Sequence, residues 1–249
     1  MRILLIEDDE SIAETLSIAL TAENMTVDHA VSGEEGLEMI NLYKYQLVAL
    51  DLGLPDMEGF SLLENLRAAK KNVSVLVISA RADIEIRLAC LDAGADDYLV
   101  KPFEMNEVIA RARALVRRAN GHSSSLLEFG GLTLDMSTYE VRVADRLVDL
   151  TNKEYKILEI LCLRGGGIVT KGHFLDHLYN GMDEPEIKII DVFVCNLRKK
   201  IKGSGINDPI IETLWGRGYR IHPAVAASLL SVEPQEPLDP LPEMKVKTA

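Results

Sequence analysis

The sequence predicts an α/β fold with a doubly wound five-stranded parallel sheet, followed by a smaller α+β domain. Between residues 1 and 118, five short apolar runs alternate with segments whose apolar residues recur at helical spacing. This alternation is typical of βαβ units around a sheet that is covered on both faces. After the polar stretch "ANGHSSS" at 119–125, which reads as a linker, the pattern changes to short strand-like pieces followed by helices.

The first region, 1–118, is divided into strands and helices by its apolar pattern. Strands are expected at 2–7, 27–30, 46–50, 73–78 and 97–100. Helices are expected at 10–22, 33–43, 56–71, 84–93 and 104–118. Runs as apolar as "VSVLVI" indicate strands that are buried on both faces, as in a parallel sheet.

The second region, 126–222, predicts an antiparallel meander, three helices and a final hairpin. The meander strands are expected around 126–129, 132–134, 140–143 and 147–149. Thr151 and Glu154 form a capping-box pattern that begins a helix ending near 164. Further helices are expected at 171–179 and 186–202, and strands at 210–214 and 219–222. From 223 to 249, proline and acidic residues predict a disordered tail.

The composition limits the classes of function. The chain has 249 residues and a net charge of −12, and most of the excess negative charge lies in 1–121. The overall charge therefore does not argue against a DNA-binding second domain. No apolar run approaches the ~20 residues that cross a membrane, so no membrane partner is expected. Cys90, Cys162 and Cys195 lack metal-ligand spacing, which favours a reducing, cytoplasmic setting.

Polar and charged residues stand where the predicted parallel strands end. Glu7 and Asp8 follow the first strand, Asp51 the third, Ser79 the fourth and Lys101 the fifth. Ligands of open parallel sheets bind at this edge, so the five side chains are expected to lie together. Three clustered carboxylates repel one another unless a cation is present, and oxygen ligands suit Mg²⁺.

Such a cluster suits phosphoryl transfer to an aspartate. A metal neutralises charge, Asp51 attacks in line, and Ser79 and Lys101 steady the phosphoryl oxygens. Taken singly, these residues read as an acidic turn, a strand-end serine and a surface lysine. Their occurrence at successive strand ends favours the phosphoryl-transfer site.

Four motifs in 1–118 resemble the receiver domain of two-component response regulators, which has a flavodoxin-like fold. They are "LLIEDD", "ALDLGLPDMEG", "VLVISAR" and "AGADDYLVKPF". The resemblance implies that Asp51 is the phospho-acceptor and that Mg²⁺ is held by Glu7, Asp8, Asp51 and the backbone carbonyl of Gly53.

The resemblance also assigns roles beyond the acidic residues. Ser79 would hydrogen-bond the phosphoryl group, Lys101 would pair with it, and the Lys101–Pro102 bond would be cis. Tyr98 would be the aromatic switch that turns inward when Ser79 moves. Phosphorylation would then favour a homodimer. Its interface residues would be Arg87, Asp96, Asp97, Glu107, Arg111 and Arg118. Alternatively, these six residues form an ordinary solvated charged surface.

The helix expected at 186–202 is apolar on one side and basic around the other. This arrangement suits a DNA major groove, although basic helix faces are more often simply solvated. The segments "LTNKEYKILEIL", "DEPEIKIIDVFVCNLRKKI" and "WGRGYRI" resemble the winged-helix domain of the OmpR/PhoB class, and more closely its CtrA-type cell-cycle regulators.

The winged-helix resemblance implies a set of DNA contacts. Base contacts are expected from Lys188, Asn196 and Lys199, phosphate contacts from Arg198 and Lys200, and a minor-groove contact from Arg217. Asn196 departs from the basic residue common among relatives, so the target sequence stays open. The segment "NGMDEP" at 180–185 matches the loop that meets RNA polymerase in this class, and a simple acidic loop is the alternative.

These observations predict a cytoplasmic transcription regulator rather than an enzyme. A sensor histidine kinase or histidine phosphotransfer protein would phosphorylate Asp51, and the dimer would bind paired half-sites on double-stranded DNA. A Mg²⁺-dependent phosphohydrolase is a competing class, but the "LPD" turn after Asp51 leaves no room for a substrate cap. A third reading keeps DNA binding and makes the receiver dimeric without phosphorylation.

Overall fold

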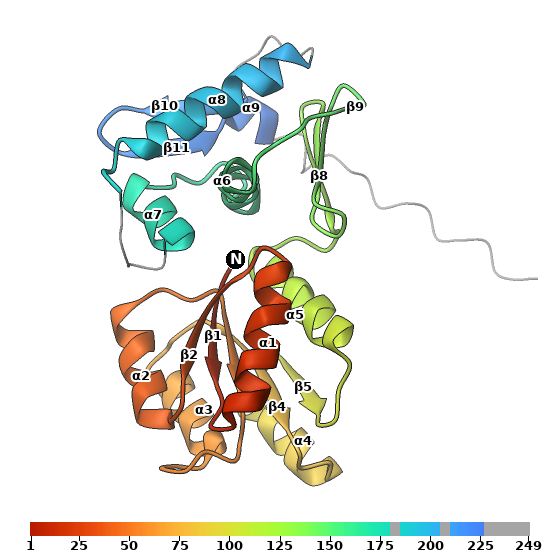
Figure 1. Ribbon diagram of the computed structural model, residues 1–249, viewed down its shortest axis with the longest axis vertical. Coiled ribbons are helices and arrows are strands. Elements are labelled where there is room, and N and C mark those ends of the chain that lie inside the picture. Colours follow the sequence, from red (N-terminus) through yellow and green to blue (C-terminus); the bar gives the residue numbers. More distant parts are fainter. Residues whose placement is uncertain (180–184, 205–209, 227–249) are drawn as a thin grey trace, which may run out of the picture.

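The computed structural model describes residues 1–179, 185–204 and 210–226, which form two domains stacked end to end (Figure 1). The N-terminal domain holds a parallel sheet in the order β2-β1-β3-β4-β5. Its strands are β1 (Arg2–Ile6), β2 (Thr26–Ala30), β3 (Leu47–Leu50), β4 (Ser74–Ser79) and β5 (Asp97–Val100). This is the doubly wound sheet that the sequence predicts.

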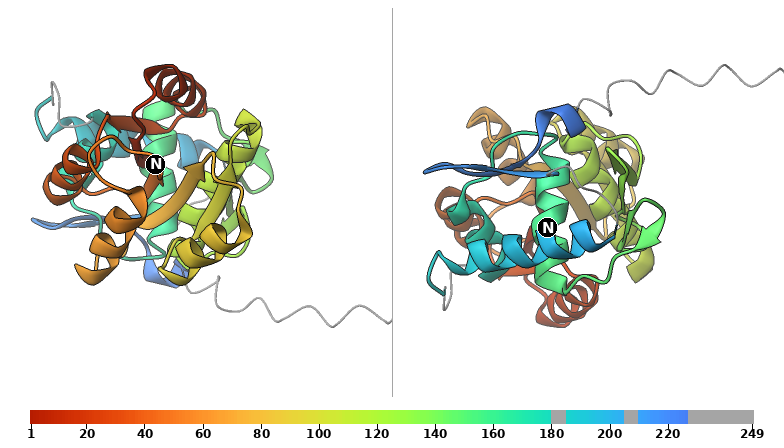
Figure 2. Two further views of the ribbon diagram at one scale, coloured as in Figure 1. Left: turned by 90° about the horizontal axis from the view of Figure 1, so that it is seen from below. Right: turned by 90° about the horizontal axis from the view of Figure 1, so that it is seen from above.

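Helices cover both faces of this sheet. They are α1 (Glu10–Ala22), α2 (Gly33–Leu42), α3 (Gly59–Ala68), α4 (Ile84–Asp92) and α5 (Met105–Ala119). Helices α1 and α5 cover one face, and α2, α3 and α4 cover the other (Figures 1 and 2). Because side chains alternate along a strand, Leu5 packs in the first core layer, and Leu4 and Ile6 pack in the second.

The C-terminal domain has the predicted α+β composition. Its elements are β6 (Leu126–Phe129), β7 (Leu132–Asp135), β8 (Glu140–Val143), β9 (Arg146–Leu147), α6 (Asn152–Leu163), α7 (Lys171–Tyr179), α8 (Ile189–Gly203), β10 (Ile211–Leu214), β11 (Gly218–Ile221) and α9 (Pro223–Ala226). The first four strands form an antiparallel meander, and β10 pairs with β11 as a hairpin. The capping box of Thr151 and Glu154 begins α6 as expected.

The segment predicted as a tail, 223–249, falls largely outside the described residues. Only 223–226 are described, and they form the single turn α9. Val225 of this turn packs against the core of the C-terminal domain.

The two domains meet at the amino-terminal end of the receiver-like sheet, opposite the edge that carries Asp51 (Figure 1). Apolar residues of α1 and α5 join those of α6 and α7 in one continuous core. Arg113 of α5 pairs with Glu23 and lies 2.8 Å from the hydroxyl of Tyr139, which itself donates to the carbonyl of Glu23. Thr26 donates to the carbonyl of His177 at 3.3 Å. The packed domains thus leave the edge that carries Asp51 uncovered.

Candidate functional site

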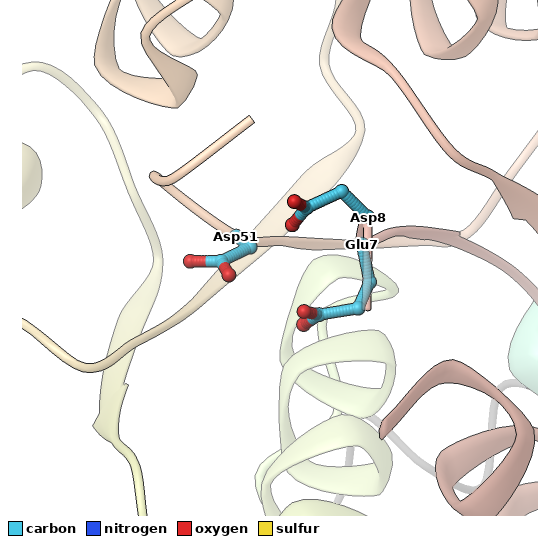
Figure 3. A group of neighbouring side chains, drawn as sticks. All are labelled: Glu7, Asp8 and Asp51. Carbon is cyan, nitrogen blue, oxygen red and sulfur yellow. The ribbon is translucent and has the colours of Figure 1, made fainter. Parts of the chain in front are cut away.

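Glu7, Asp8 and Asp51 converge at the carboxyl edge of the parallel sheet (Figure 3). One carboxylate oxygen from each residue lies within 4.8 Å of the others. Glu7 is buried, Asp51 is partly buried and Asp8 is exposed. An all-oxygen cluster that is open on one side fits Mg²⁺, because this ion prefers oxygen ligands and keeps several waters.

Lys101 stands between two of these carboxylates. Its Nζ lies 2.7 Å from Oε2 of Glu7 and 2.8 Å from Oδ2 of Asp51. Burial raises the pKa of Glu7, and the hydrogen bond from Lys101 opposes that shift without cancelling it. Burial alone would lower the pKa of Lys101, but the bonds and charges of Asp51 and Glu7 raise it overall. The Lys101–Pro102 bond is cis, as the resemblance implies.

The loop after β3 holds Asp51 through backbone contacts. The Asp51 amide donates to the carbonyl of Ile6 at 2.9 Å, and the Gly53 amide donates to Oδ1 of Asp51 at 3.2 Å. A Cβ on Gly59 would lie 2.2 Å from the carbonyl oxygen of Asp51. The start of α3 therefore approaches the Asp51 backbone as closely as only glycine permits.

Helix α3 begins at Gly59 rather than at the predicted residue 56, and Asp56 lies in the loop before it. Its carboxylate accepts from the amides of Gly33 at 2.9 Å and Glu34 at 2.8 Å, at the start of α2. These bonds lower the pKa of Asp56. Asp56 thus connects the loop of the acidic cluster to the neighbouring helix, a contact that the sequence pattern did not reveal.

Ser79, the last residue of β4, and Tyr98, the second residue of the neighbouring β5, are both buried, with 2% and 7% of their surface exposed. The Tyr98 hydroxyl donates to the carbonyl of Arg81 at 2.7 Å, and the Arg81 amide donates to Oγ of Ser79 at 3.3 Å. The tyrosine therefore occupies an inward position and is linked to the serine through Arg81.

The six residues expected at a dimer interface lie on or beside α4, β5 and α5, but several are bonded within the chain. Arg111 lies 2.6 Å from Asp97 and 2.5 Å from Glu107. Asp96 lies 3.1 Å from Arg67, and its carboxylate accepts from the amide of Val75 at 2.8 Å. Arg87 and Arg118 are exposed. A dimer that used Asp97, Glu107 and Arg111 would have to exchange intramolecular pairs for intermolecular ones.

Helix α4 also exposes three apolar side chains that sequence reasoning missed. Ile84, Leu88 and Leu91 are 59%, 53% and 39% exposed. Because they are spaced four and three residues apart, they lie on the same side of the helix. The same spacing normally indicates a core-facing stripe. In α4 the fully buried residue is Cys90 instead. Only the packed structure reveals which apolar stripe lacks a partner.

Helix α8 is packed on one side and open on the other. Its buried residues are Ile190, Val194, Leu197 and Ile201, the stripe that the sequence predicts. Lys188, Asn196 and Lys199 are all exposed. These three expected base-contacting residues thus lie outside the buried stripe of α8, a helix at the end of the molecule farthest from the parallel sheet (Figure 1).

Arg198 and Lys200 have partners inside the C-terminal domain. The guanidinium of Arg198 donates to the carbonyl of Ile211 at 2.8 Å and to Thr213 at 2.7 Å. Lys200 lies 2.8 Å from the buried carboxylate of Glu154. These two residues therefore connect α8 to the hairpin and to α6, a role that the basic pattern alone did not indicate.

The hairpin β10–β11 carries the exposed tip at 215–217. Trp215 is 92% exposed and Arg217 is exposed beside it. Gly218 has a φ of +136°, and a Cβ there would lie 2.1 Å from the carbonyl oxygen of Val169. Glycine at 218 thus lets the hairpin dock on the body of the domain while its tip projects.

The loop expected to meet RNA polymerase, 180–185, lies outside the described residues except for Pro185. Within the part of the chain that the structure describes, no helix is both long and apolar enough to span a bilayer.

Comparisons with known proteins agree with both domains. Residues 3–113 match the response regulator receiver domain, and residues 145–221 match the C-terminal domain of transcriptional regulatory proteins. The cell cycle response regulator CtrA of Brucella ovis is 49% identical over 219 residues, which cover 88% of this chain and 94% of that protein. The CtrA protein of Brucella anthropi is 48% identical over the same coverage.

Among solved structures, DrrB of Thermotoga maritima, an OmpR/PhoB homologue, is 27% identical with a TM-score of 0.44. The match covers 88% of this chain and 98% of DrrB. The family assignment rests on the sequence matches. The chain therefore belongs to the two-component response regulators of the OmpR/PhoB class, and is a phosphorylation-regulated, DNA-binding transcription factor.

Proposed function

We propose that Asp51 accepts the phosphoryl group from a sensor histidine kinase or a histidine phosphotransfer protein. The proposed receiver is 1–118, joined by the linker 119–125 to a DNA-binding domain at 126–222 and followed by a tail at 223–249. The observation that carries the proposal is the convergence of Glu7, Asp8 and Asp51 on one open edge, with Lys101 bonded to Glu7 and Asp51.

Each residue of the acidic edge has its own proposed role in phosphoryl transfer. We propose that Glu7, Asp8, Asp51 and the Gly53 carbonyl hold Mg²⁺, which when bound would neutralise charge on the incoming phosphoryl group. A carboxylate oxygen of Asp51 is the proposed nucleophile, because the acidic cluster lies at an open edge where Asp51 is only partly buried. Lys101 then exchanges part of its contact with Asp51 for a contact with the phosphoryl oxygens.

Ser79 and Tyr98 are the proposed link from phosphorylation to the surface. A phosphoryl group on Asp51 would draw the Ser79 hydroxyl toward it and hold Tyr98 in its inward position. Because that position exists without phosphorylation, the modification acts by shifting populations rather than by creating a new state. The surface that responds is the one formed by α4, β5 and α5.

We propose that this surface forms a symmetric dimer after phosphorylation. The exposed stripe of Ile84, Leu88 and Leu91 would form its apolar centre. The charged residues around that centre would be Arg87, Asp96, Asp97, Glu107, Arg111 and Arg118. The contact between receiver and DNA-binding domain lies at the opposite end of the sheet, so it leaves the stripe uncovered.

The dimer would bring two winged-helix domains onto paired half-sites of DNA. Lys188, Asn196 and Lys199 are the proposed base contacts from the open side of α8, and Arg217 is the proposed minor-groove contact. Arg198 and Lys200 would approach phosphates from the positions in which their internal partners hold them. The loop at 180–185 is the proposed contact for RNA polymerase.

The names of the similar proteins support a proposal about which genes this chain controls. Because the similar proteins are cell cycle response regulators, we propose that this chain controls transcription of cell-cycle genes in the cytoplasm.

Phosphotransfer and DNA binding are best tested in the same samples. Radiolabel transfer from a phosphorylated histidine kinase should require Mg²⁺ and should be lost in Asp51→Asn. Gel shifts should show tighter, dimeric DNA binding by the labelled protein. If repeated candidate kinases give no labelling, and DNA binding is equal in wild type and Asp51→Asn, a receiver that dimerises without phosphorylation replaces this proposal.

A further inference from the structure

A cavity of about 440 Å³ lies between the two domains, at the end of the sheet opposite Asp51. Its receiver wall comes from the loops that precede β3 and β4, and includes Tyr43, Lys44 and Lys71. Its other wall comes from α6 and α7, and includes Arg164 and His177. A cavity of this size accommodates a small organic molecule and is much larger than one inorganic phosphate.

The walls of this cavity carry unbalanced positive charge. Lys44, Lys71 and Arg164 line it, and no described carboxylate does. None of these three cationic side chains forms an ion pair with a described residue, in a chain whose net charge is −12. Three unpaired cations from two domains are an electrostatic match for an anion.

Two of the cationic side chains act on His173, which is partly buried beside the fully buried His177. Burial and the charge of Arg164, with a weaker effect of Lys44, together lower the pKa of His173 to about 4, and the charge of Asp176 opposes this shift. Lys44 and Arg164, which come from different domains, therefore both lie close enough to His173 to affect its charge. An anion between them would relieve this mutual repulsion.

The neighbouring His177 presents a polar atom that lacks a partner. Its side chain is 2% exposed, its Nδ1 lies 3.0 Å from the carbonyl of His173, and its Nε2 has no hydrogen-bond partner among the described residues. A buried polar group without a partner is costly, so it indicates a site where a ligand or water completes the bonding. His177 lines the cavity.

The remaining lining groups favour an anion with a planar organic part. Tyr43 and Tyr45 contribute aromatic rings, with the guanidinium of Arg2 4.7 and 5.2 Å from their centroids, and Asn72 contributes an exposed amide. Aromatic rings pack on flat heterocycles, and amides pair with their edges. We propose that this cavity binds a nucleoside phosphate, with the phosphates between Lys44 and Arg164 and the base beside the tyrosines.

Such a ligand would bridge the receiver and the DNA-binding domain. Because its walls come from both domains, the ligand would bind only when the domains are packed together. Binding would therefore stabilise the packed arrangement by linkage, at a site distinct from the phosphorylated edge.

Isothermal titration calorimetry on the full chain, with EDTA present, tests the proposal. The probes are ATP, AMP and inorganic pyrophosphate. A single site is expected for a nucleotide, with affinity at least ten-fold lower in Lys44→Glu and in Arg164→Glu. Lys70→Glu is the matched control, because Lys70 neighbours Lys71 in the chain but does not line the cavity.

A further variant tests whether the site needs both domains. Arg113 does not line the cavity, but it pairs with Glu23 of its own domain and bonds Tyr139 across the domain contact. Arg113→Ala should therefore weaken nucleotide binding several-fold. Absence of binding at millimolar nucleotide, or equal weakening in Lys70→Glu, overturns the proposal. Pyrophosphate binding as tightly as ATP would overturn the nucleoside part, and an unchanged affinity in Arg113→Ala would overturn the bridging part.

Discussion

The ammonium of Lys101 lies 2.8 Å from Oδ2 of Asp51, although β4 separates the strands that these residues follow. The same nitrogen lies 2.7 Å from Glu7, whose side chain is 1% exposed. One cation therefore lies between two carboxylates, one of them deeply buried. With Asp8 the cluster holds three carboxylates and one ammonium, so it keeps a net negative charge that suits a divalent cation.

Removal of Lys101 should destabilise the receiver in a pH-dependent way. Lys101→Ala leaves Glu7 buried without its cation, at an expected cost of about 3 kcal/mol at pH 7. An acid whose folded pKa is raised loses stability as pH rises above its unfolded pKa, so the cost should shrink toward pH 5. Urea unfolding of wild type and Lys101→Ala at pH 7 and at pH 5 measures the loss of stability. Lys70→Ala is the control, and an equal loss at both pH values would contradict the explanation.

Gly59→Ala and Gly53→Ala should differ although both add one methyl group near Asp51. At Gly59 the Cβ would meet the Asp51 carbonyl oxygen at 2.2 Å and the Leu52 Cα at 2.7 Å. We expect a loss of about 1–3 kcal/mol and slower phosphorylation. At Gly53 the nearest atoms are 3.9 Å away, so the change should be tolerated. Chemical denaturation and labelling with acetyl phosphate check both, and equal behaviour of the two variants would refute the packing argument.

His177 should make the protein less stable in mild acid. Burial, with the charge of His173 as the next cause, lowers the pKa of His177 to about 2. The unfolded chain therefore binds a proton near pH 6.5 that the folded chain cannot bind. Stability should fall by up to about 1.4 kcal/mol per pH unit below that value. In His177→Phe the free energy of unfolding should fall less between pH 7 and 5.5 than in the wild type. The difference in stability between the two proteins at pH 8 reports the change in packing alone. If the two stability curves run parallel with pH, the explanation is wrong.

Arg217 should contribute to DNA binding through charge. Arg217→Ala should weaken binding and reduce the slope of log affinity against log salt by about 1, because one cation fewer displaces counterions from the DNA. Arg146→Ala, at an exposed position in the meander, is the control. Trp215, the only tryptophan in the chain, lies two residues away, and its emission should change when DNA covers the hairpin tip. An unchanged salt slope together with unchanged emission would remove the hairpin from the interface.

Leu88 should be needed for the dimer but not for phosphorylation. Leu88→Glu adds a charge to the exposed apolar stripe of α4, so the phosphorylated protein should remain monomeric in light scattering. Leu42→Glu is a matched control, because Leu42 is 74% exposed on α2. Labelling of Asp51 should be unchanged in both variants. A phosphorylated Leu88→Glu dimer of normal affinity would move the interface elsewhere.

The sequence by itself determined the elements and the edge at which the polar residues meet. Both are local or topological: apolar periods select strands and helices, and parallel strands bring their carboxyl ends to one edge. Glu7, Asp8, Asp51 and Lys101 therefore could be grouped from their positions alone. The apolar stripe inside α8 was equally readable, because one-sided packing imposes a period of 3.6 residues.

The tertiary structure decided what depends on distances between segments far apart in the chain. No local pattern distinguishes Arg198 and Lys200, which are bonded inside the domain, from Lys199, which is exposed. Likewise, the spacing of Ile84 and Leu88 predicts burial, and only packing shows that no partner covers them. The cavity between the domains has the same origin, because its charged walls become neighbours only when the two domains dock.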